Sequence, residues 1–189
     1  MRILLASFIS FSLLLGGCSS IISATTDGPL HEDYGRRTPG TAMDDDLIET
    51  KVEVNLSKTD ATFDAAHVNV HAYNGVVLLV GQVPTDELKN TATEIAQKTR
   101  KVRRVHNELE VAGPVSSLAK ANDAWITGKI KSKLLLAESV QSDRVVVVTE
   151  NGVTYLMGLL TNEEAERAAD IARNTSGVRK VVKIFEIIE

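Results

Sequence analysis

The segments NGVVLLVG at residues 74–81 and NGVTYLMG at residues 151–158 decide the fold of this chain of 189 residues. In each, an Asn-Gly pair stands between two apolar runs. This pair is the strongest short signal for a tight hairpin, because both of its residues can adopt positive φ. The segments begin 77 residues apart and agree at Asn, Gly, the first Val, one Leu and the final Gly. We therefore expect two copies of one hairpin-based unit.

The repeat continues on both sides of the hairpins. The corresponding segments are VRRVHNELEV at 102–111 and VRKVVKIFEI at 178–187 downstream, and Asp45, Ile48, Lys51 and Asp123, Ile126, Lys129 upstream. Two units of similar length are therefore predicted, at residues 44–111 and 119–189, with a short linker at residues 112–118.

The pattern within each unit indicates helix, strand, hairpin, strand, helix and strand. Ile126, Ile130 and Leu134 recur at every fourth position, which predicts a helix over residues 119–137 with these side chains on its core face. The β-branched run at 145–149 predicts the strand that follows.

The second helix of each unit is predicted to begin at Thr85 or Thr161. Thr161 and Glu164 have the spacing of a capping box, in which each side chain satisfies an otherwise unbonded amide of the other residue. This helix is predicted to end near Gly177 in the second unit, before a final strand. The fold class is therefore α+β, with two helices on one face of a small mixed three-stranded sheet in each unit.

The N-terminus has a different composition from the rest. MRILLASFISFSLLLGGC has one arginine and then an apolar run, which is typical of a signal peptide and is short for a bilayer span. Small residues precede Cys18, the only cysteine, and this arrangement resembles the bacterial lipobox. We predict removal of residues 1–17, acylation of Cys18 and a flexible tether over 18–43. An ordinary secretory signal with an incidental cysteine is the alternative.

Each unit resembles a BON domain, whose hallmarks are the N-G-x-V-x-L-x-G hairpin, an alanine-rich helix and a closing G-V-x-x-V strand. The second unit keeps this last motif at 177–181, whereas the first has Lys101 in place of the glycine. If this site needs a left-handed conformation, the lysine costs about 1 kcal/mol.

The signal, tether and two units together resemble outer-membrane lipoproteins with two BON domains. The resemblance implies a protein on the periplasmic face of the outer membrane, since Ser19 rather than aspartate follows the acylated cysteine. It also implies non-catalytic binding of phospholipid or other hydrophobic ligands, with a role in outer-membrane integrity and at the division site.

The helix predicted at 119–137 carries a second apolar stripe opposite its core face. At about 100° per residue this stripe holds small and apolar side chains, with lysines on both flanks. Tryptophan favours the interfacial layer of a bilayer, and lysine can meet lipid phosphates. We therefore predict an anionic phospholipid site made of Trp125, Gly128, Lys129, Lys131, Ser132, Lys133, Leu135 and, if its loop lies beside this helix, Leu159.

Charge distinguishes the two units. The first helix, at 44–58, has five acidic and two basic residues, a formal charge of −3, whereas 119–137 has four lysines and one aspartate, a charge of +3. Only the second is expected to meet anionic lipid. Two other uses of the stripe stay open: docking of a protein partner, as in an adaptor for envelope assembly or peptidoglycan remodelling, and packing against the first unit.

Composition and motifs argue against other classes of function. The net charge of −4 and the aromatic content of 4% do not favour nucleic-acid binding. His67 and His71 share one strand face but lie about 13 Å apart, too far to ligate one metal ion. The sequence suggests no catalytic cluster, cofactor or metal site, so we expect a protein that is not an enzyme.

Overall fold

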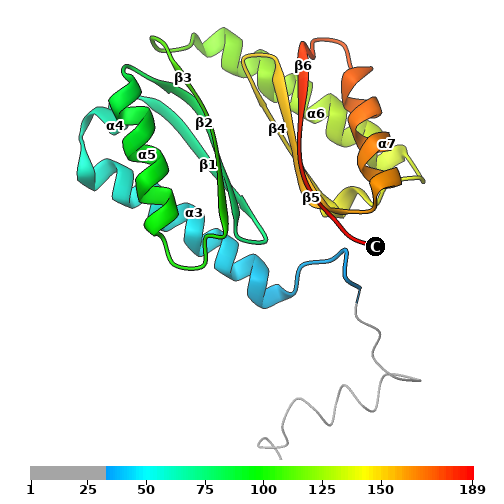
Figure 1. Cartoon of the computed structure of the whole chain (residues 1–189). Coiled ribbons are helices and arrows are strands. Elements are labelled where there is room, and N and C mark those ends of the chain that lie inside the picture. The colour runs from blue at the N-terminus through cyan, green and yellow to red at the C-terminus, as the bar shows by residue number, and fades with distance from the viewer. Residues whose placement is uncertain (1–32) are drawn as a thin grey trace, which may run out of the picture. The chain divides into compact units, whose positions relative to one another are not determined.

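The computed structural model describes residues 33–189, and Tyr34–Glu189 form one compact unit. The predicted signal peptide, Cys18 and the first part of the predicted tether lie outside the described residues. Within this unit each sequence repeat forms its own sheet and its own helical layer (Figure 1).

The first repeat has the predicted α+β arrangement. Its elements are α3 (Pro39–Thr59), the short α4 (Thr62–Ala65), β1 (His67–Tyr73), β2 (Val76–Val83), α5 (Asp86–Lys98) and β3 (Arg104–Val111). The strand order is β1-β2-β3, with β1 antiparallel and β3 parallel to β2. Buried side chains of α3 and α5, including Val52 and Ala92, meet one face of this sheet.

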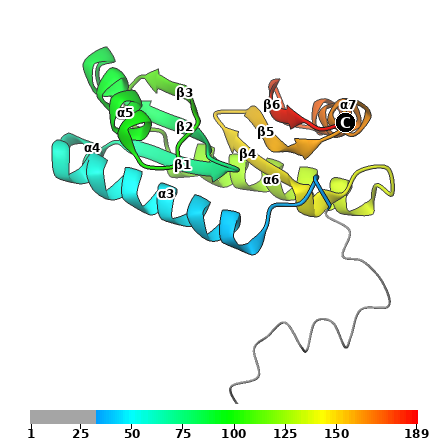
Figure 2. The ribbon, with the colours of Figure 1, turned by 60° about the horizontal axis from the view of Figure 1, so that its bottom comes forward.

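The second repeat has the same topology. Its elements are α6 (Ser117–Leu136), a short 3-10 helix η2 (Ser142–Arg144), β4 (Val145–Glu150), β5 (Val153–Leu160), α7 (Asn162–Arg173) and β6 (Lys180–Ile187). The strand order is β4-β5-β6, again antiparallel and then parallel. In both views α6 runs beside β4 (Figures 1 and 2). Ile126, Ile130 and Leu134 are at most 1% exposed, which confirms the predicted core face.

Both first helices begin earlier than the periodicity predicted. Helix α3 begins at Pro39 with Thr38 as its N-cap, so residues 39–43 are helical and do not belong to the tether. Helix α6 has Ser116 as its N-cap and takes in the end of the predicted linker. Thr-Pro and Ser at these positions are typical N-terminal signals, but they lie outside the apolar pattern from which the helices were predicted.

The end of the predicted tether is also bound to the folded unit. Arg37 donates to the carboxylate of Asp45 at 2.6 Å, and its guanidinium lies 4.0 Å from the centre of the Tyr73 ring. Arg36 forms an ion pair of 3.2 Å with Asp143 of the second repeat. The chain is therefore attached to both repeats before α3 begins.

Both hairpins have the predicted left-handed geometry. Asn74 and Gly75 have φ of 51° and 73°, and Asn151 and Gly152 have φ of 47° and 71°. Lys101 also has a positive φ, 75°, as has Gly177 at the equivalent position in the second repeat. Lys101 therefore adopts the left-handed conformation that was considered for it because it replaces a glycine. This conformation is unfavourable for any residue that has a Cβ.

The second helix of each repeat begins at the predicted threonine. The Thr85 side chain accepts from the Leu88 amide, and Thr161 and Glu164 make both hydrogen bonds of a capping box. The predicted start signals are therefore confirmed in both repeats.

A third apolar cluster joins the two repeats. Each sheet has a helix-covered face and a second apolar face, and the two second faces contribute to one buried cluster. Its buried members are Tyr73, Val76, Leu78, Val80, Val148, Tyr155, Met157 and Ile184. Burial, together with nearby glutamates, raises the pKa of Tyr155 to about 12. Every residue of β2 is buried because both of its faces are covered.

Reciprocal hydrogen bonds border this cluster. The Asn74 side chain donates to Glu186 at 2.8 Å, and the Asn151 side chain donates to Glu110 at 3.3 Å. Asn74 corresponds to Asn151, and Glu110 to Glu186, in the sequence repeat. Each repeat therefore donates from its hairpin asparagine to the glutamate in the last strand of the other repeat. Such reciprocal contacts are typical of an isologous dimer interface.

Candidate functional site

The outer face of α6 carries large apolar side chains in solvent. Trp125 is 68% exposed and Leu135 is 74% exposed, as the sequence predicted for the stripe opposite the core. Leu118 and Leu136 are even more exposed and belong to the same helix face. We call Leu118, Trp125, Leu135 and Leu136 the α6 patch. Because Trp125 is exposed, packing against the first repeat does not account for it.

Sequence reasoning missed two members of the α6 patch. Leu118 and Leu136 lie seven residues before and eleven residues after Trp125, spacings that return to the same side of a helix. This signal was in the sequence, but Leu118 fell in the predicted linker. The α6 patch therefore extends along most of the helix.

The small residues beside Trp125 leave its surroundings open. A Cβ added at Gly128 would meet no atom within 4 Å, so no close packing inside the described chain requires glycine here. The Ser132 hydroxyl donates to the Gly128 carbonyl at 2.9 Å and so has a partner within the helix. The centre of the face is therefore smooth, with its serine already hydrogen-bonded.

The predicted lysines divide between the two flanks of α6. On one flank Lys129 donates to the Ser176 carbonyl, and Lys133 donates to Asn174 O at 3.0 Å and Thr175 Oγ1 at 3.1 Å. These acceptors lie in the turn after α7, where helix carbonyls lack partners within their own helix. Lys129 and Lys133 therefore connect α6 to this turn, a role that the sequence did not predict.

Lys131 lies on the other flank, at a groove of about 440 Å³ beside β1 and β4. Its lining includes Lys120 and Thr127 from α6 and His71 from β1. Neither the Lys131 ammonium nor the Lys120 ammonium has a hydrogen bond or ion pair with any residue of the described chain. Burial lowers the pKa of His71, and the nearby Lys131 lowers it further. Lys131 is therefore the predicted site lysine whose ammonium stays available.

Leu159 does not extend this surface. It lies within β5 and packs against the cluster between the two sheets, whereas α6 covers the opposite face of its sheet. Alternate residues of a strand point to opposite faces, so Leu159 faces the first repeat. Its predicted place beside the Trp125 helix was wrong.

In the range 33–189 no three His, Cys, Asp or Glu side chains converge as metal ligands. In that same range no helix has both the length and the apolarity to cross a bilayer. His67 instead contacts Glu150, with Nε2 and Oε2 3.5 Å apart.

Comparison with protein families identifies the two repeats. The BON domain model matches residues 44–113 and 122–189. The chain belongs to the BON-domain family.

Known relatives narrow this assignment. The chain is 38% identical over 186 residues to the outer membrane lipoprotein DolP of Haemophilus influenzae, covering 98% of this chain and 96% of that protein. It is 39% identical to the 21 kDa hemolysin of Actinobacillus pleuropneumoniae, covering 84% of each. The chain is thus a dual BON-domain protein of the DolP type, a type of outer-membrane lipoprotein.

The similarity to solved structures is weaker than the similarity to these relatives. The C-terminal domain of CdsD, a structural protein of the type III secretion system of Chlamydia trachomatis, aligns with 77% of this chain and 67% of its own. The sequence identity is 15% and the TM-score is 0.30.

Proposed function

We propose that this lipoprotein binds anionic phospholipid at the periplasmic face of the outer membrane through α6, without catalysing a reaction. It would be held there by acylated Cys18, would support outer-membrane integrity and would be enriched at the division site. The observation that carries the proposal is the exposed indole of Trp125 on a helix whose other face is fully packed. Family membership and the similarity to DolP support the location.

The chemistry of the α6 patch favours a bilayer surface. An indole and three leucines on one helix face suit the boundary between lipid headgroups and acyl chains. The available Lys131 would add about 1 kcal/mol at an anionic surface, and Lys120 would add a similar amount. Such a contact is weak by itself, but an acyl anchor raises its effective concentration to the millimolar range.

A protein partner is the second candidate for the same face. An exposed apolar stripe also fits a hydrophobic groove of an envelope-assembly or peptidoglycan-remodelling protein. The flank that carries Lys131 favours lipid, because its ammonium has no carboxylate partner in the described chain and lies beside the apolar stripe.

Flotation of the unit Tyr34–Glu189 with liposomes tests the proposal. We expect binding to vesicles that contain phosphatidylglycerol and none to neutral vesicles. Trp125→Glu should abolish binding, because it places a carboxylate at the centre of the α6 patch. Lys131→Gln should weaken binding about fivefold. Circular dichroism would establish that each variant is folded.

Lys129→Gln is the matched control, since it removes the same charge from the other flank. Its ammonium already binds the Ser176 carbonyl, so we expect a lower melting temperature and a smaller effect on flotation. If the folded wild-type unit does not float with anionic vesicles, the membrane contact of α6 is refuted and a protein partner becomes the better explanation.

A further inference from the structure

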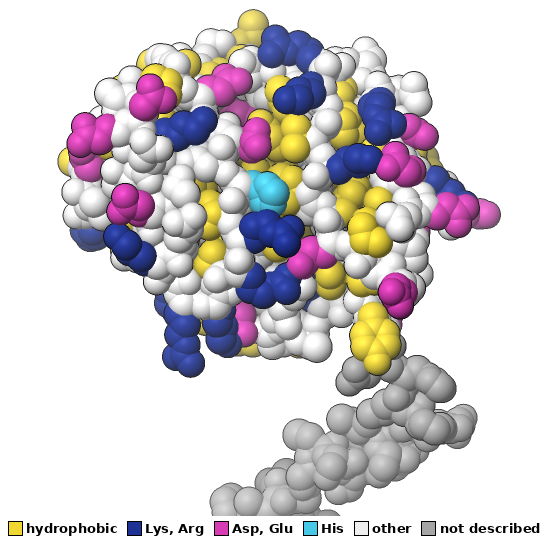
Figure 3. All heavy atoms as spheres, viewed as in Figure 1, with side chains coloured by type: hydrophobic (Ala, Val, Ile, Leu, Met, Phe, Trp, Pro, Cys, Tyr) yellow, Lys and Arg dark blue, Asp and Glu magenta, His cyan; other side chains and the backbone are white. Residues whose placement is uncertain are grey.

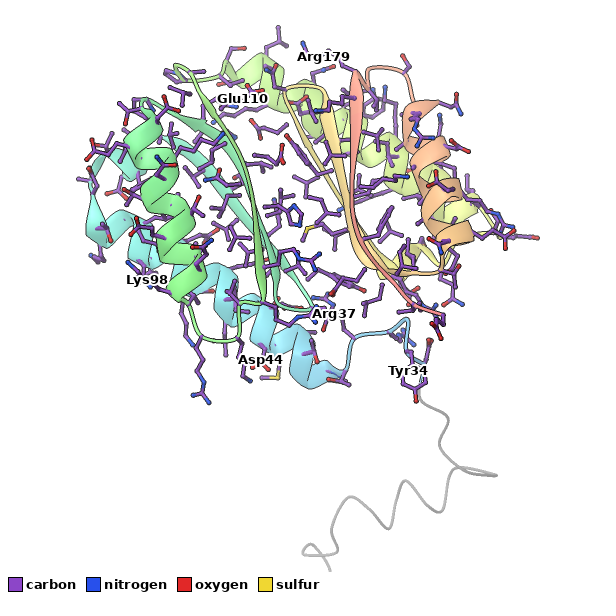
Figure 4. All side chains as sticks on the ribbon, viewed as in Figure 1. Tyr34, Arg37, Asp44, Lys98, Glu110 and Arg179 are labelled. Carbon is purple, nitrogen blue, oxygen red and sulfur yellow. The ribbon has the colours of Figure 1, made fainter. Side chains whose placement is uncertain are left out.

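A basic hollow lies between α3 and α5 of the first repeat. It has a volume of about 430 Å³, and its lining is Lys51, Asn55, Lys58, Thr59, Ile95, Lys98, Thr99 and Arg100. Four of these residues are cationic and none is acidic. In Figure 4 Lys98 marks the end of α5 beside this hollow, and Figure 3 shows Lys and Arg side chains gathered below that end.

The lining of the hollow is basic because the charges of α3 are segregated around the helix. Lys51 and Lys58 lie on the flank that faces α5. Glu49 lies on the flank toward β1, where its carboxylate accepts from the Ala72 amide at 2.7 Å. A net charge summed along α3 is negative, but its α5 flank is locally positive. The sequence-based expectation that only the second of these helices meets anionic lipid rested on the summed charge of each helix, which does not show this flank.

Nearby carboxylates pair with only one of the four cations that line the hollow. Lys98 forms an ion pair of 3.1 Å with Glu94 on the exposed surface of α5. Asp44 forms an ion pair of 2.5 Å with Lys101, which does not line the hollow. The charged groups of the other three cations, Lys51, Lys58 and Arg100, have no ion pair or hydrogen bond with another residue in the range 33–189. Three unneutralised cations at one hollow repel each other, and this repulsion would be relieved by an anion.

The second repeat shows that the fold does not require these cations. The equivalent hollow between α6 and α7, about 460 Å³, is lined by Lys133, Leu136, Ala137, Asp170, Ile171 and Asn174. Leu136 stands where the first repeat has Lys58, and Asn174 stands where it has Lys98. Lys133 there is already hydrogen-bonded to the chain. The same place in the fold thus has one lysine and one aspartate in the second repeat, but four cations and no acidic residue in the first.

We propose that the hollow between α3 and α5 binds a phosphate-bearing anion. Arg100 can present two parallel N–H groups to phosphate oxygens, and Lys51 and Lys58 can approach as point charges. A phosphate monoester has up to two charges and three terminal oxygens, so it matches three cations better than a carboxylate does. The phosphate can belong to a lipid headgroup or to a soluble molecule. This site is separate from the α6 patch and does not depend on it.

Calorimetric titration of the unit Tyr34–Glu189 with pyrophosphate tests the site. We expect saturable binding, weakened at least about tenfold by Lys58→Gln with Arg100→Gln, because two of the three free cations are lost. Arg179→Gln with Lys180→Gln is the matched control, because it removes one arginine and one lysine from exposed positions of the second repeat, and it should bind as the wild type does. Glu94→Gln, which frees Lys98, should strengthen binding.

Transfer of the site gives a test that does not depend on loss of function. Leu136→Lys with Asn174→Lys places cations in the equivalent hollow, and we expect a second binding event for pyrophosphate. Absence of binding by the folded wild-type unit would overturn the proposal. Equal weakening by the control pair would overturn it as well, because binding would then follow net charge alone.

Flotation with vesicles distinguishes a lipid headgroup from a soluble compound as the source of the phosphate. The vesicles would contain phosphatidic acid, and the protein would carry Trp125→Glu so that the α6 contact is absent. Flotation that requires Lys58 and Arg100 supports a lipid headgroup as the ligand, whereas pyrophosphate binding without flotation supports a soluble phosphate compound. Failure of the membrane function proposed for α6 would leave the pyrophosphate result unaffected.

Discussion

Asp45 and Asp123 have equivalent structural roles in the two repeats. Each is a buried carboxylate on a first helix, and each accepts hydrogen bonds from both amides of an Asn-Gly hairpin, at 2.7 to 2.9 Å. The charge of Asp45 is also paired with Arg37. The sequence showed these aspartates as matching positions, but their partners lie about thirty residues away along the chain. Their role in joining helix to hairpin therefore needed the structure.

Replacing Asp123 by alanine tests this role. It leaves two amides at the Asn151-Gly152 turn without an acceptor, one of them in a buried hydrogen bond. We expect the free energy of unfolding to fall by about 3 kcal/mol, measured by urea denaturation. Asn122→Ala, at the exposed neighbouring position, should change it little. A similar effect of both substitutions would contradict the assignment.

At the scale of the element, α6 combines a fold-determined face with a face that the fold leaves free. Its core residues pack in the second-repeat cluster, and Lys129 and Lys133 bond to the turn after α7. Its outer face has an open glycine and exposed leucines. Interior glycine weakens a helix, so Gly128 lowers stability without a packing reason in the described chain. A smooth surface for close approach of a membrane would account for it.

Gly128→Ala tests whether the fold needs this glycine. The added Cβ meets nothing, so we expect the free energy of unfolding to rise by about 0.5 to 1 kcal/mol. Gly177→Ala is the contrasting variant, because φ is 103° there and a Cβ would lie 2.8 Å from Ile126 Cδ1. Urea denaturation of both variants would measure these changes. A Gly128→Ala protein less stable than the wild type would refute the prediction that the fold does not need glycine at this position.

At the scale of the whole molecule, the two repeats are joined by their sheets and by a polar border that depends on ionised groups. Glu186 accepts from Asn74 and pairs with Arg103 of the other repeat. Burial of Glu186 would raise its pKa, but these interactions outweigh burial and lower it below the usual 4.5. His71, beside Lys131 of the other repeat, has a pKa below 6.5 because burial disfavours its charged form.

These shifts predict a loss of stability in two steps as the pH falls. Below pH 6.5 the unfolded state takes up the His71 proton before the folded state does, so unfolding becomes easier until the folded pKa is passed. The stability from Glu186 is present above pH 4.5 and is lost as the pH falls through its lowered folded pKa.

Thermal unfolding of the unit Tyr34–Glu189 at a series of pH values would measure both steps. His71→Gln should make the step that begins below pH 6.5 smaller, and Glu186→Gln should make the one below pH 4.5 smaller. Neither step should vanish, because the pKa of His106 is also lowered, as are those of Asp60 and Glu166. Each variant should leave the other step unchanged, because the two groups lie at different places along the interface. Identical pH profiles for wild type and variants would disprove the assignment.

Most of the fold followed from local patterns. Asn-Gly pairs, helical periodicity and threonine caps act over a few residues, and the strands and helices formed where these signals stood. The ends of the first helices were less well predicted, because Thr38 and Ser116 act outside the apolar pattern. The site was predicted in part: Trp125 and Leu135 followed from the helical wheel, whereas Leu159 depended on which face of a strand meets which layer.

Two repeated α+β units, and an apolar stripe on the first helix of the second unit, could be predicted from the sequence because both follow from the spacing of neighbouring residues. Only the tertiary structure decided how those units are used. It placed the two sheets together through apolar faces, assigned Lys129 and Lys133 to the turn after α7, and gathered Lys51, Lys58, Lys98 and Arg100 at one hollow. These depend on contacts between distant segments, which packing of the complete chain creates and local spacing does not encode.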